Sequence, residues 1–173
     1  CDRLGWNIET NKIVTCHLGN GASIAAIDGG KSIDTSMGFT PLSGLVMGTR
    51  SGDLDPSILF YIMEKEEITM NSLHALLNRP SGLLGLSGYA SDMRDLLEEA
   101  QNGDRRCQQA VDVFCNKVKQ FIGSYIATLN GCDSIIFTAG IGENSAEIRE
   151  RVLTNFDYLG IKIDSEKNQN AKR

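Results

Sequence analysis

Three glycine-rich stretches of the chain carry residue types that can bind or transfer phosphate. The first, residues 17–23, reads HLGNGAS and follows an apolar, β-branched segment. A turn built on Gly19 and Gly21 lets backbone amides approach a phosphate with no Cβ in the way. Asn20 can donate to an oxygen, and His17 stands at the end of the preceding segment. The same residues also fit an ordinary hairpin turn, which is the more frequent role of an Asn-Gly pair.

The second stretch, residues 34–53, is long, rich in glycine and poor in helix-forming residues. A loop of this length inside a compact domain is usually functional or disordered, and its apolar residues disfavour disorder. Arg50 lies between Gly48 and Gly52. A guanidinium in that position can donate a planar fork of hydrogen bonds to a transferring phosphoryl group. A surface ion pair with Asp53 is an equally good interpretation.

The third stretch, residues 137–145, joins a strand to a helix. Residues 134–138 form a short apolar segment, typical of a strand buried on both faces of an α/β sheet. Gly140 and Gly142 then predict a sharp turn before a helix over 145–154. A strand, a glycine turn and a helix N-terminus recur as a ligand-binding arrangement at the end of parallel strands. The spacing is neither GxGxxG nor a Walker A sequence.

Hydrophobic spacing and turn residues predict the elements that position these stretches. Residues 12–36 predict a three-stranded meander, which the strand at 134–138 joins in one sheet. Asp55 is expected to cap a helix that has Pro56 at its first position. The other predicted segments are helices at 70–78, 92–101, 105–129 and 145–154, loops at 37–54 and 79–91, a strand at 160–164 and a polar tail at 165–173. The fold class is therefore α/β, with helices packed on the sheet.

Composition narrows the classes of function. The chain has 173 residues, enough for one domain with a core, and its net charge of −5 disfavours a nucleic-acid binder. No apolar run reaches the roughly 18 residues of a membrane span, and no secretory signal opens the chain. The five cysteines form no CxxC pair. They are expected to be reduced, in a cytoplasmic protein without a metal cluster or a disulfide framework. Because the chain begins with Cys1, a preceding segment is expected to have been removed.

Taken together, the three stretches resemble the acetate kinase family, as do residues 81–85 and 91–94. The resemblance covers nearly the whole chain, in order. It implies a ribonuclease H-like, actin-like ATPase domain, as in acetate and sugar kinases, Hsp70 and actin, with a mixed sheet and flanking helices. It further implies that residues 1–173 are the C-terminal nucleotide-binding domain of such a kinase, incomplete, with an N-terminal domain and a final strand and helix outside this chain.

The resemblance also implies roles for individual residues. Arg50 and His17 match catalytic positions, where Arg50 would stabilise the phosphoryl group in flight, and Pro41 matches a residue of the acyl pocket. Met93 stands where the family often has an aromatic residue. The positions that match nucleotide and phosphate contacts are His17, Gly19, Asn20, Gly21, Asp92, Met93, Arg94, Gly140, Ile141, Gly142, Glu143 and Asn144. No metal ligand is expected in this chain, because the residues that hold Mg²⁺ would lie outside it.

The implied activity is reversible phosphoryl transfer between ATP and acetate, giving ADP and acetyl phosphate, in a homodimeric cytoplasmic enzyme that uses Mg²⁺. The substrates are small molecules, with neither nucleic acid nor membrane as a partner. Propionate and butyrate kinase are the nearest enzymatic alternatives. The alternative of another class is a non-catalytic nucleotide-binding or dimerisation module, which has no need of a guanidinium such as Arg50. The isolated chain is expected to be inactive, because further catalytic groups would lie in the other domain.

Overall fold

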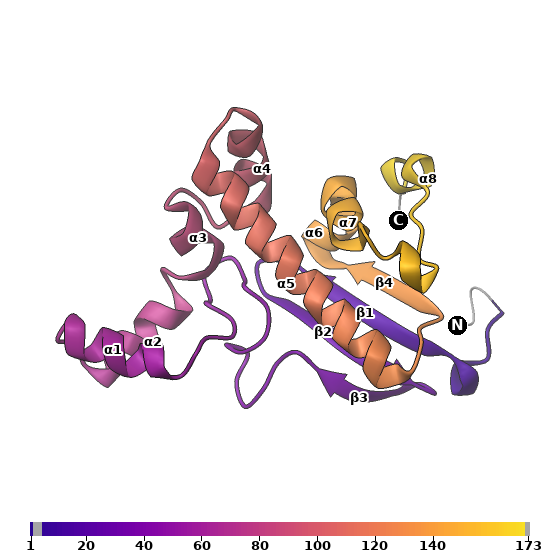
Figure 1. The fold of residues 1–173 in the computed structure, drawn as a ribbon, viewed down its shortest axis with the longest axis horizontal. Helices are drawn as coiled ribbons and strands as arrows, with labels where there is room; N and C mark the ends of the chain where they lie inside the picture. The colour runs from indigo at the N-terminus through magenta and orange to yellow at the C-terminus, as the bar shows by residue number, and fades with distance from the viewer. Residues whose placement is uncertain (2–4, 172–173) are drawn as a thin grey trace. The chain divides into compact units, whose positions relative to one another are not determined.

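The computed structural model describes Cys1 and residues 5–171, and it confirms an α/β fold with a mixed sheet (Figure 1). The chain divides into two compact units. The first unit holds residues 1–36 and 115–173, and the second holds residues 37–114. The predicted long helix is present as α5 (Arg105–Leu129), which contributes residues to both units. We describe each unit separately.

The first unit contains a four-stranded sheet whose order is β3-β2-β1-β4. Its strands are β1 (Lys12–Leu18), β2 (Ala22–Asp28), β3 (Lys31–Thr35) and β4 (Ser134–Thr138). The first three pair antiparallel, as the predicted meander requires, and β4 lies parallel to β1. The turn between β2 and β3 uses Gly29 and Gly30, whose φ angles of +54° and +78° favour glycine. The predicted meander and its junction with residues 134–138 are therefore confirmed.

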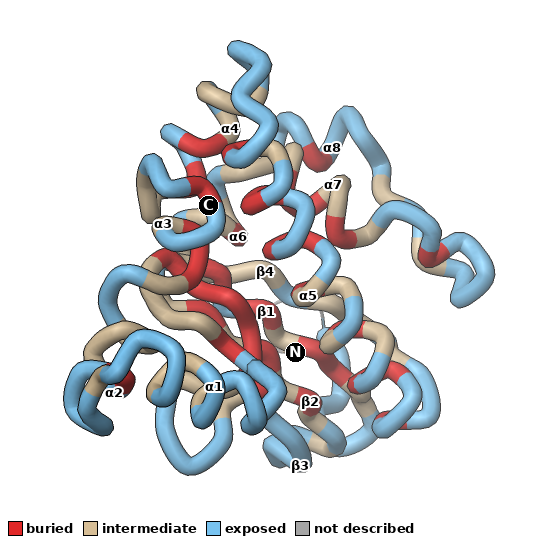
Figure 2. Tube along the Cα trace, turned by 60° about the vertical axis from the view of Figure 1, so that its left-hand side comes forward, coloured by how far each residue is buried: buried red, intermediate tan, exposed pale blue. Residues whose placement is uncertain are grey.

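Alternation along the strands builds the core of this unit. Every second residue of β1 and β2 is fully buried, whereas most of the residues between them keep partial exposure (Figure 2). Helix α6 (Ala139–Asn144) contacts β1 and β4, and α7 (Ala146–Leu153) contacts both α6 and α8 (Ser165–Gln169). The residues of the strands and of the later helices that are completely shielded from solvent include Val14, Cys16, Leu18, Ala22, Ile24, Ala26, Val118, Ile122, Ile148 and Val152.

Three predictions for this unit were wrong in detail. Strand β4 is not buried on both faces, because it is an edge strand of the described sheet and Ile136 is 40% exposed. Residues 139–144 form the short helix α6 in place of a simple turn. Residues 160–164 form no strand, because they pair with no other described strand and instead lead from the left-handed Gly160 into α8. Part of the predicted polar tail is therefore helical, capped by the Asp164 side chain.

The second unit contains α1 (Ser57–Lys65), α2 (Met70–Asn78), α3 (Gly82–Ser87) and α4 (Met93–Gln101). Asp55 caps α1 as predicted, since its Oδ1 accepts from the amide of Ser57 at 2.8 Å. Helix α3 falls inside the predicted loop at 79–91 and corrects that prediction. The predicted loop at 37–54 carries no helix or strand, yet its Leu45, Val46 and Met47 are buried, so this loop has an apolar core of its own.

The cysteines are free thiols, as expected from their number and spacing. Cys16, Cys107 and Cys115 are buried, whereas Cys1 and Cys132 are partly exposed. Burial, and secondarily the neighbouring Cys132, raises the pKa of the Cys16 thiol to about 12. None of the helices in the described part of the chain has the length and apolar character needed to cross a membrane.

Candidate functional site

In the first unit, the ends of two parallel strands bring the first and third glycine-rich stretches together. His17 and Thr138 are paired in the register of β1 and β4. The His17 Nδ1 lies 3.1 Å from the Thr138 Oγ1 in a hydrogen bond, and His17 remains exposed. Because parallel strands place their carboxyl ends at the same edge of a sheet, both stretches emerge side by side at an edge where α/β proteins commonly bind ligands.

The turn after β1 approaches the start of α6 closely. Within the turn, the Gly19 amide donates to the Gly21 carbonyl at 3.1 Å. A Cβ added to Gly19 would lie 3.3 Å from that carbonyl oxygen and 3.5 Å from the Cβ of Ala139. The turn therefore has little room for a side chain at Gly19, whereas the side chain of Asn20 is exposed to solvent.

Helix α6 begins with a residue in an uncommon backbone conformation. Ala139 has a φ of +64°, which for a residue other than glycine costs on the order of 1–3 kcal/mol. Its amide donates to the Oε1 of Glu143 at 3.1 Å. The Glu143 carboxylate thus accepts from an amide at the start of its own helix that has no backbone partner within that helix. Residues in such strained conformations cluster at ligand sites.

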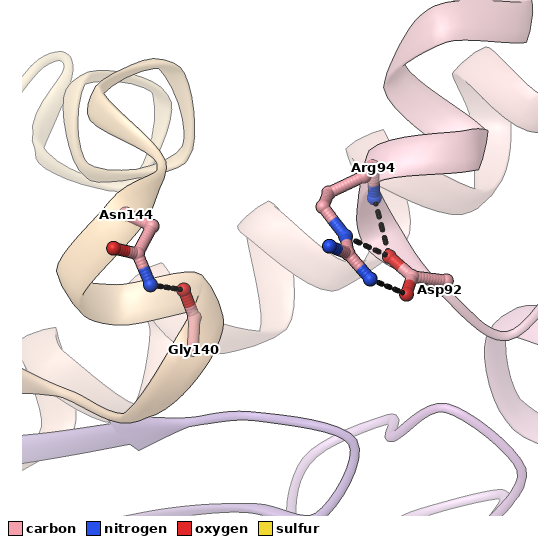
Figure 3. A network of polar contacts seen from close by, with 4 residues as sticks. All are labelled: Asp92, Arg94, Gly140 and Asn144. Carbon is pink, nitrogen blue, oxygen red and sulfur yellow. Dashed lines mark hydrogen bonds and ion pairs between the residues drawn. The ribbon is translucent and has the colours of Figure 1, made fainter.

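On the exposed side of α6, the backbone is more accessible than the side chains are. The Asn144 Nδ2 donates to the Gly140 carbonyl at 2.8 Å, so this amide folds back on its own helix (Figure 3). Gly140 is exposed, and no atom lies within 4 Å of the place its Cβ would take. Gly142 is buried, and Ile141 is half-buried. Gly140 is thus the residue of α6 at which a ligand can approach the main chain most closely.

In the second unit, Arg50 and Pro41 lie next to each other. The Arg50 Nη1 donates to the Pro41 carbonyl oxygen at 3.1 Å and to the Met47 Sδ at 3.4 Å. The predicted alternative partner, Asp53, accepts instead from the Gly44 amide at 2.7 Å. The structure therefore disfavours the interpretation of Arg50 as the surface ion-pair partner of Asp53, and it brings a half-exposed guanidinium beside the proline that was matched to an acyl pocket.

The segment that carries Arg50 is held by backbone hydrogen bonds from α3. The amides of Leu83 and Leu84 donate to the Met47 and Gly48 carbonyls at 2.9 and 3.0 Å. Across the loop itself, the Met47 amide donates to the Arg50 carbonyl at 3.1 Å. Because amides at a helix N-terminus lack partners within the helix, these carbonyls satisfy them and fix the path of the chain through Arg50.

Gly82, the first residue of α3, makes this contact possible. Its φ is +62°, and an added Cβ would collide with the Met47 carbonyl and lie 2.6 Å from the Arg50 carbonyl oxygen. A side chain at this position would therefore push the Arg50 segment away from α3. This role is only indirectly visible in the sequence, because a glycine within residues 81–85 is equally typical of a loop.

Asp92 and Arg94 form a compact pair at the start of α4. The Asp92 Oδ1 accepts from the Arg94 amide at 2.9 Å and from its Nε at 3.1 Å, while the Arg94 Nη2 donates to Oδ2 at 2.7 Å (Figure 3). These bonds, the side-chain bond first, lower the pKa of Asp92 to about 2 and raise the pKa of Arg94. Met93 is 3% exposed, so its side chain packs inside the protein.

The predicted site residues therefore gather in three places. The first unit brings His17, the turn at Gly19–Gly21 and helix α6 to one region. The second unit joins Arg50 to Pro41 and holds Asp92, Met93 and Arg94 at the start of α4. No group of three metal-binding side chains occurs among Cys1 and residues 5–171. The exposed backbone at Gly140 and the exposed Asn20 side-chain amide are polar groups of the kinds that phosphates and riboses hydrogen-bond.

Known proteins match this chain over nearly its whole length. A model of the acetokinase family matches residues 2–173. The chain is 58% identical to acetate kinases of Acetivibrio thermocellus and Methanosarcina thermophila over 166 residues, which is 96% of this chain but only 42% and 41% of those proteins.

Two solved structures are similar over nearly all of this chain. The acetate kinase of Porphyromonas gingivalis has a TM-score of 0.97 and 42% identity, with coverage of 100% of this chain and 43% of that protein. A propionate kinase of Francisella tularensis has a TM-score of 0.89 and 46% identity, with coverage of 94% and 42%. The first match confirms that the chain has the fold of an acetate kinase, which is α/β with a mixed sheet and flanking helices. The chain, which spans less than half the length of these relatives, belongs to the acetokinase family.

Proposed function

We propose that this chain is the C-terminal nucleotide-binding part of an enzyme that transfers a phosphoryl group between ATP and acetate, giving ADP and acetyl phosphate. The observation that carries the proposal is the 58% identity to proteins named acetate kinase over 96% of the chain. The geometry supports it, because a positioned guanidinium lies beside the proline matched to the acyl pocket. A non-catalytic nucleotide-binding module would have no use for that arrangement.

In this proposal Arg50 acts on the group in flight. Negative charge spreads over the equatorial oxygens of the phosphoryl group as it leaves ADP, and a guanidinium neutralises it through two parallel N–H donors. The Pro41 carbonyl and the Met47 Sδ accept from Nη1, which orients the guanidinium plane and leaves the N–H groups of Nη2 and Nε for the phosphoryl oxygens. Pro41 would at the same time offer an apolar ring to the methyl group of acetate.

The nucleotide is proposed to bind in the first unit. His17, Gly19, Asn20 and Gly21 would contact phosphate oxygens, and the hydrogen bond between His17 and Thr138 would fix the imidazole ring. The exposed backbone at Gly140 would approach ribose and base. Asp92 and Arg94 are proposed to contact adenosine because they match family positions that do so, and Met93 between them is buried.

Mg²⁺ belongs to the proposal as a partner of ATP, which it would supply with charge neutralisation across the phosphates. Its ligands are proposed to lie outside this chain, as the resemblance to the acetate kinase family implies.

Propionate is the second candidate acceptor, because the similar propionate kinase structure is 46% identical to this chain. The test uses the full-length protein that contains this chain, with ATP, Mg²⁺ and either acid, and measures the acyl phosphate as its hydroxamate. We expect a higher kcat/KM for acetate than for propionate. A preference for propionate would replace the acceptor and keep phosphoryl transfer, whereas no acyl phosphate with either acid would reject the proposal.

We also propose that the full-length protein is a cytoplasmic homodimer that associates through α1 and α2. Helix α1 has no buried residue although most of its side chains are apolar. Phe60, Tyr61 and Met70 are 73%, 59% and 66% exposed. Covering such an apolar surface with a second copy removes it from water, which is the main driving force of homodimer formation.

A further inference from the structure

Outside the predicted site, one buried arginine contacts the nucleotide segment from behind. Arg149 lies on α7 and is 9% exposed. Its Nη1 donates to the carbonyls of Gly142 and Glu143 at 2.9 and 2.8 Å. Its other nitrogens reach α8, where Nε donates to the Asn168 Oδ1 and Nη2 to the Asn168 carbonyl, both at 2.7 Å.

The acceptors of these four hydrogen bonds are neutral oxygens. A guanidinium that is removed from water without a carboxylate partner loses solvation, and burial accordingly lowers the pKa of Arg149. Ion pairing therefore does not explain why a charged side chain is kept inside this unit. Its five donors in a fixed planar fork suit another task, which is to hold several carbonyls at set positions.

The carbonyls in question belong to the last turn of α6. Helix α6 has six residues, and Ser145, in extended conformation, ends it before α7 begins. The carbonyl groups in the last turn of a helix accept no hydrogen bond from within that helix. The carbonyls of Gly142 and Glu143 therefore need a donor from outside it. Arg149 supplies that donor and, through Asn168, ties the same carbonyls to α8.

We propose that Arg149 is a positioning residue for nucleotide binding, and that Asn168 of α8 supports this role by binding Arg149. The inference rests on the proposed function in one respect, namely that the backbone around Gly140 contacts the nucleotide. Arg149 does not touch the ligand. It holds the C-terminal end of α6, and thereby the strained Ala139 and the exposed Gly140 at the other end, in one conformation.

Asn168 is bound at both ends of its side chain. Its Oδ1 accepts from Arg149, while its Nδ2 donates to the Ala146 carbonyl at 2.9 Å. Asn168 is 7% exposed, so water does not readily replace these bonds. A change at Asn168 therefore acts on α6 indirectly, through Arg149 and through Ala146 at the start of α7.

The test measures the Kd for ADP by calorimetry in the full-length protein, at a temperature where circular dichroism shows every variant folded. Arg149→Lys keeps the positive charge but loses the planar set of guanidinium donors. It should weaken ADP binding by at least about fivefold. Asn168→Ala should weaken it in the same direction and by less. The double variant should lose less ADP affinity than the product of the two single factors, because both residues act through one network.

The matched control is Arg151→Ala. Arg151 is an arginine on the same helix in a partly exposed pair with Glu147, and its replacement should leave the Kd for ADP within about twofold of the parent value.

A lower melting temperature with an unchanged Kd in both Arg149→Lys and Asn168→Ala would overturn the inference and leave Arg149 with a structural role alone. If Arg149→Lys does not fold, Asn168→Ala decides, since it keeps both bonds from Arg149 to α6. The readout is separate from the proposed function. Failure of the parent protein to make acyl phosphate would reject that function, while the ADP measurements would still test the role of Arg149. A parent protein that binds no ADP overturns both.

Discussion

The guanidinium of Arg50 donates to the carbonyl oxygen of Pro41, nine positions earlier in the chain, at 3.1 Å. This one contact joins a residue matched to catalysis with a residue matched to the acyl pocket. It also means that the guanidinium is oriented before any substrate arrives, and a preorganised donor needs no reorganisation when charge develops.

The first prediction concerns Arg50. In the full-length protein, Arg50→Ala should lower kcat by about 10² to 10³, with little change in the Kd for ADP, because the guanidinium acts on charge that develops in the transition state. Lysine should restore only part of the rate, since it cannot make the forked contact. Steady-state kinetics with acetate and calorimetry with ADP supply the two quantities.

The control is Arg79→Ala, which removes an exposed arginine from the same unit and should leave kcat unchanged. A kcat for Arg50→Ala within about threefold of the parent corresponds to less than about 1 kcal/mol and would reject the assigned role.

The second prediction concerns Gly82. Gly82→Ala should lower kcat markedly as well as the melting temperature, because the new Cβ lies 2.6 Å from the Arg50 carbonyl oxygen and must displace the segment that carries the guanidinium. Gly103→Ala separates the two causes. Gly103 also has a positive φ, +98°, but no atom lies within 4 Å of its added Cβ. It should destabilise the protein by about 1 kcal/mol through strain alone and leave kcat intact. Equal effects on kcat at both positions would show that close packing behind Arg50 is unimportant.

The sequence predicted the elements whose signals are local. The turn at Gly29 and Gly30 needs positive φ at both residues, and the pattern of α5 repeats over many turns, so both followed from short windows of sequence. Helix α3 was not predicted, because it contains glycines, which are more typical of loops. In addition, its N-terminal amides donate to the carbonyls of Met47 and Gly48, which lie far away along the chain. The strand expected at 160–164 failed for the opposite reason, since an alternating pattern becomes a strand only when another strand pairs with it.

The candidate site, too, could be predicted from the sequence only in part. Arg50, His17 and the glycine turns could be named from the sequence, because long strings of residues resembled one family. Arg149 could not, since an arginine in an amphipathic helix normally faces water and only the tertiary contacts with Gly142, Glu143 and Asn168 show that it is buried. The hydrogen bond from Arg50 to Pro41 could not be predicted either, because nothing in a glycine-rich loop specifies which way its side chains turn.

The third prediction concerns self-association. Phe60→Glu places a charge in the middle of the exposed apolar face of α1 and should shift the mass measured by light scattering at micromolar concentration from dimer toward monomer. Circular dichroism should stay unchanged, because Phe60 is 73% exposed and contributes little to the fold. Glu64→Gln, on the same helix, alters charge without touching the apolar side chains and should keep the dimer. A monomeric parent protein at that concentration would contradict the proposed dimer at once.

The last prediction concerns pH and the pair formed by Asp92 and Arg94. Hydrogen bonds from Arg94 hold the pKa of Asp92 at about 2, below its ordinary value of 3.8. A carboxyl group whose pKa is depressed by folding stabilises the protein above its unfolded pKa and loses that contribution as the pH falls through its folded pKa. The contribution of this pair is therefore complete above about pH 4 and disappears toward pH 2.

Arg94→Gln removes the charged donor and should return the pKa of Asp92 toward 3.8, as followed by NMR of its carboxyl carbon. The parent should exceed the variant in free energy of unfolding above about pH 4, and the difference should shrink as the solution is acidified. The difference should be small, because the Arg94 side chain is 88% exposed and water and salt screen the pair. Arg79→Gln is the control, and its difference from the parent should not vary over this range of pH. A pKa of Asp92 that stays near 2 in Arg94→Gln would show that the helix start, through its backbone amides, and not the guanidinium, stabilises the carboxylate.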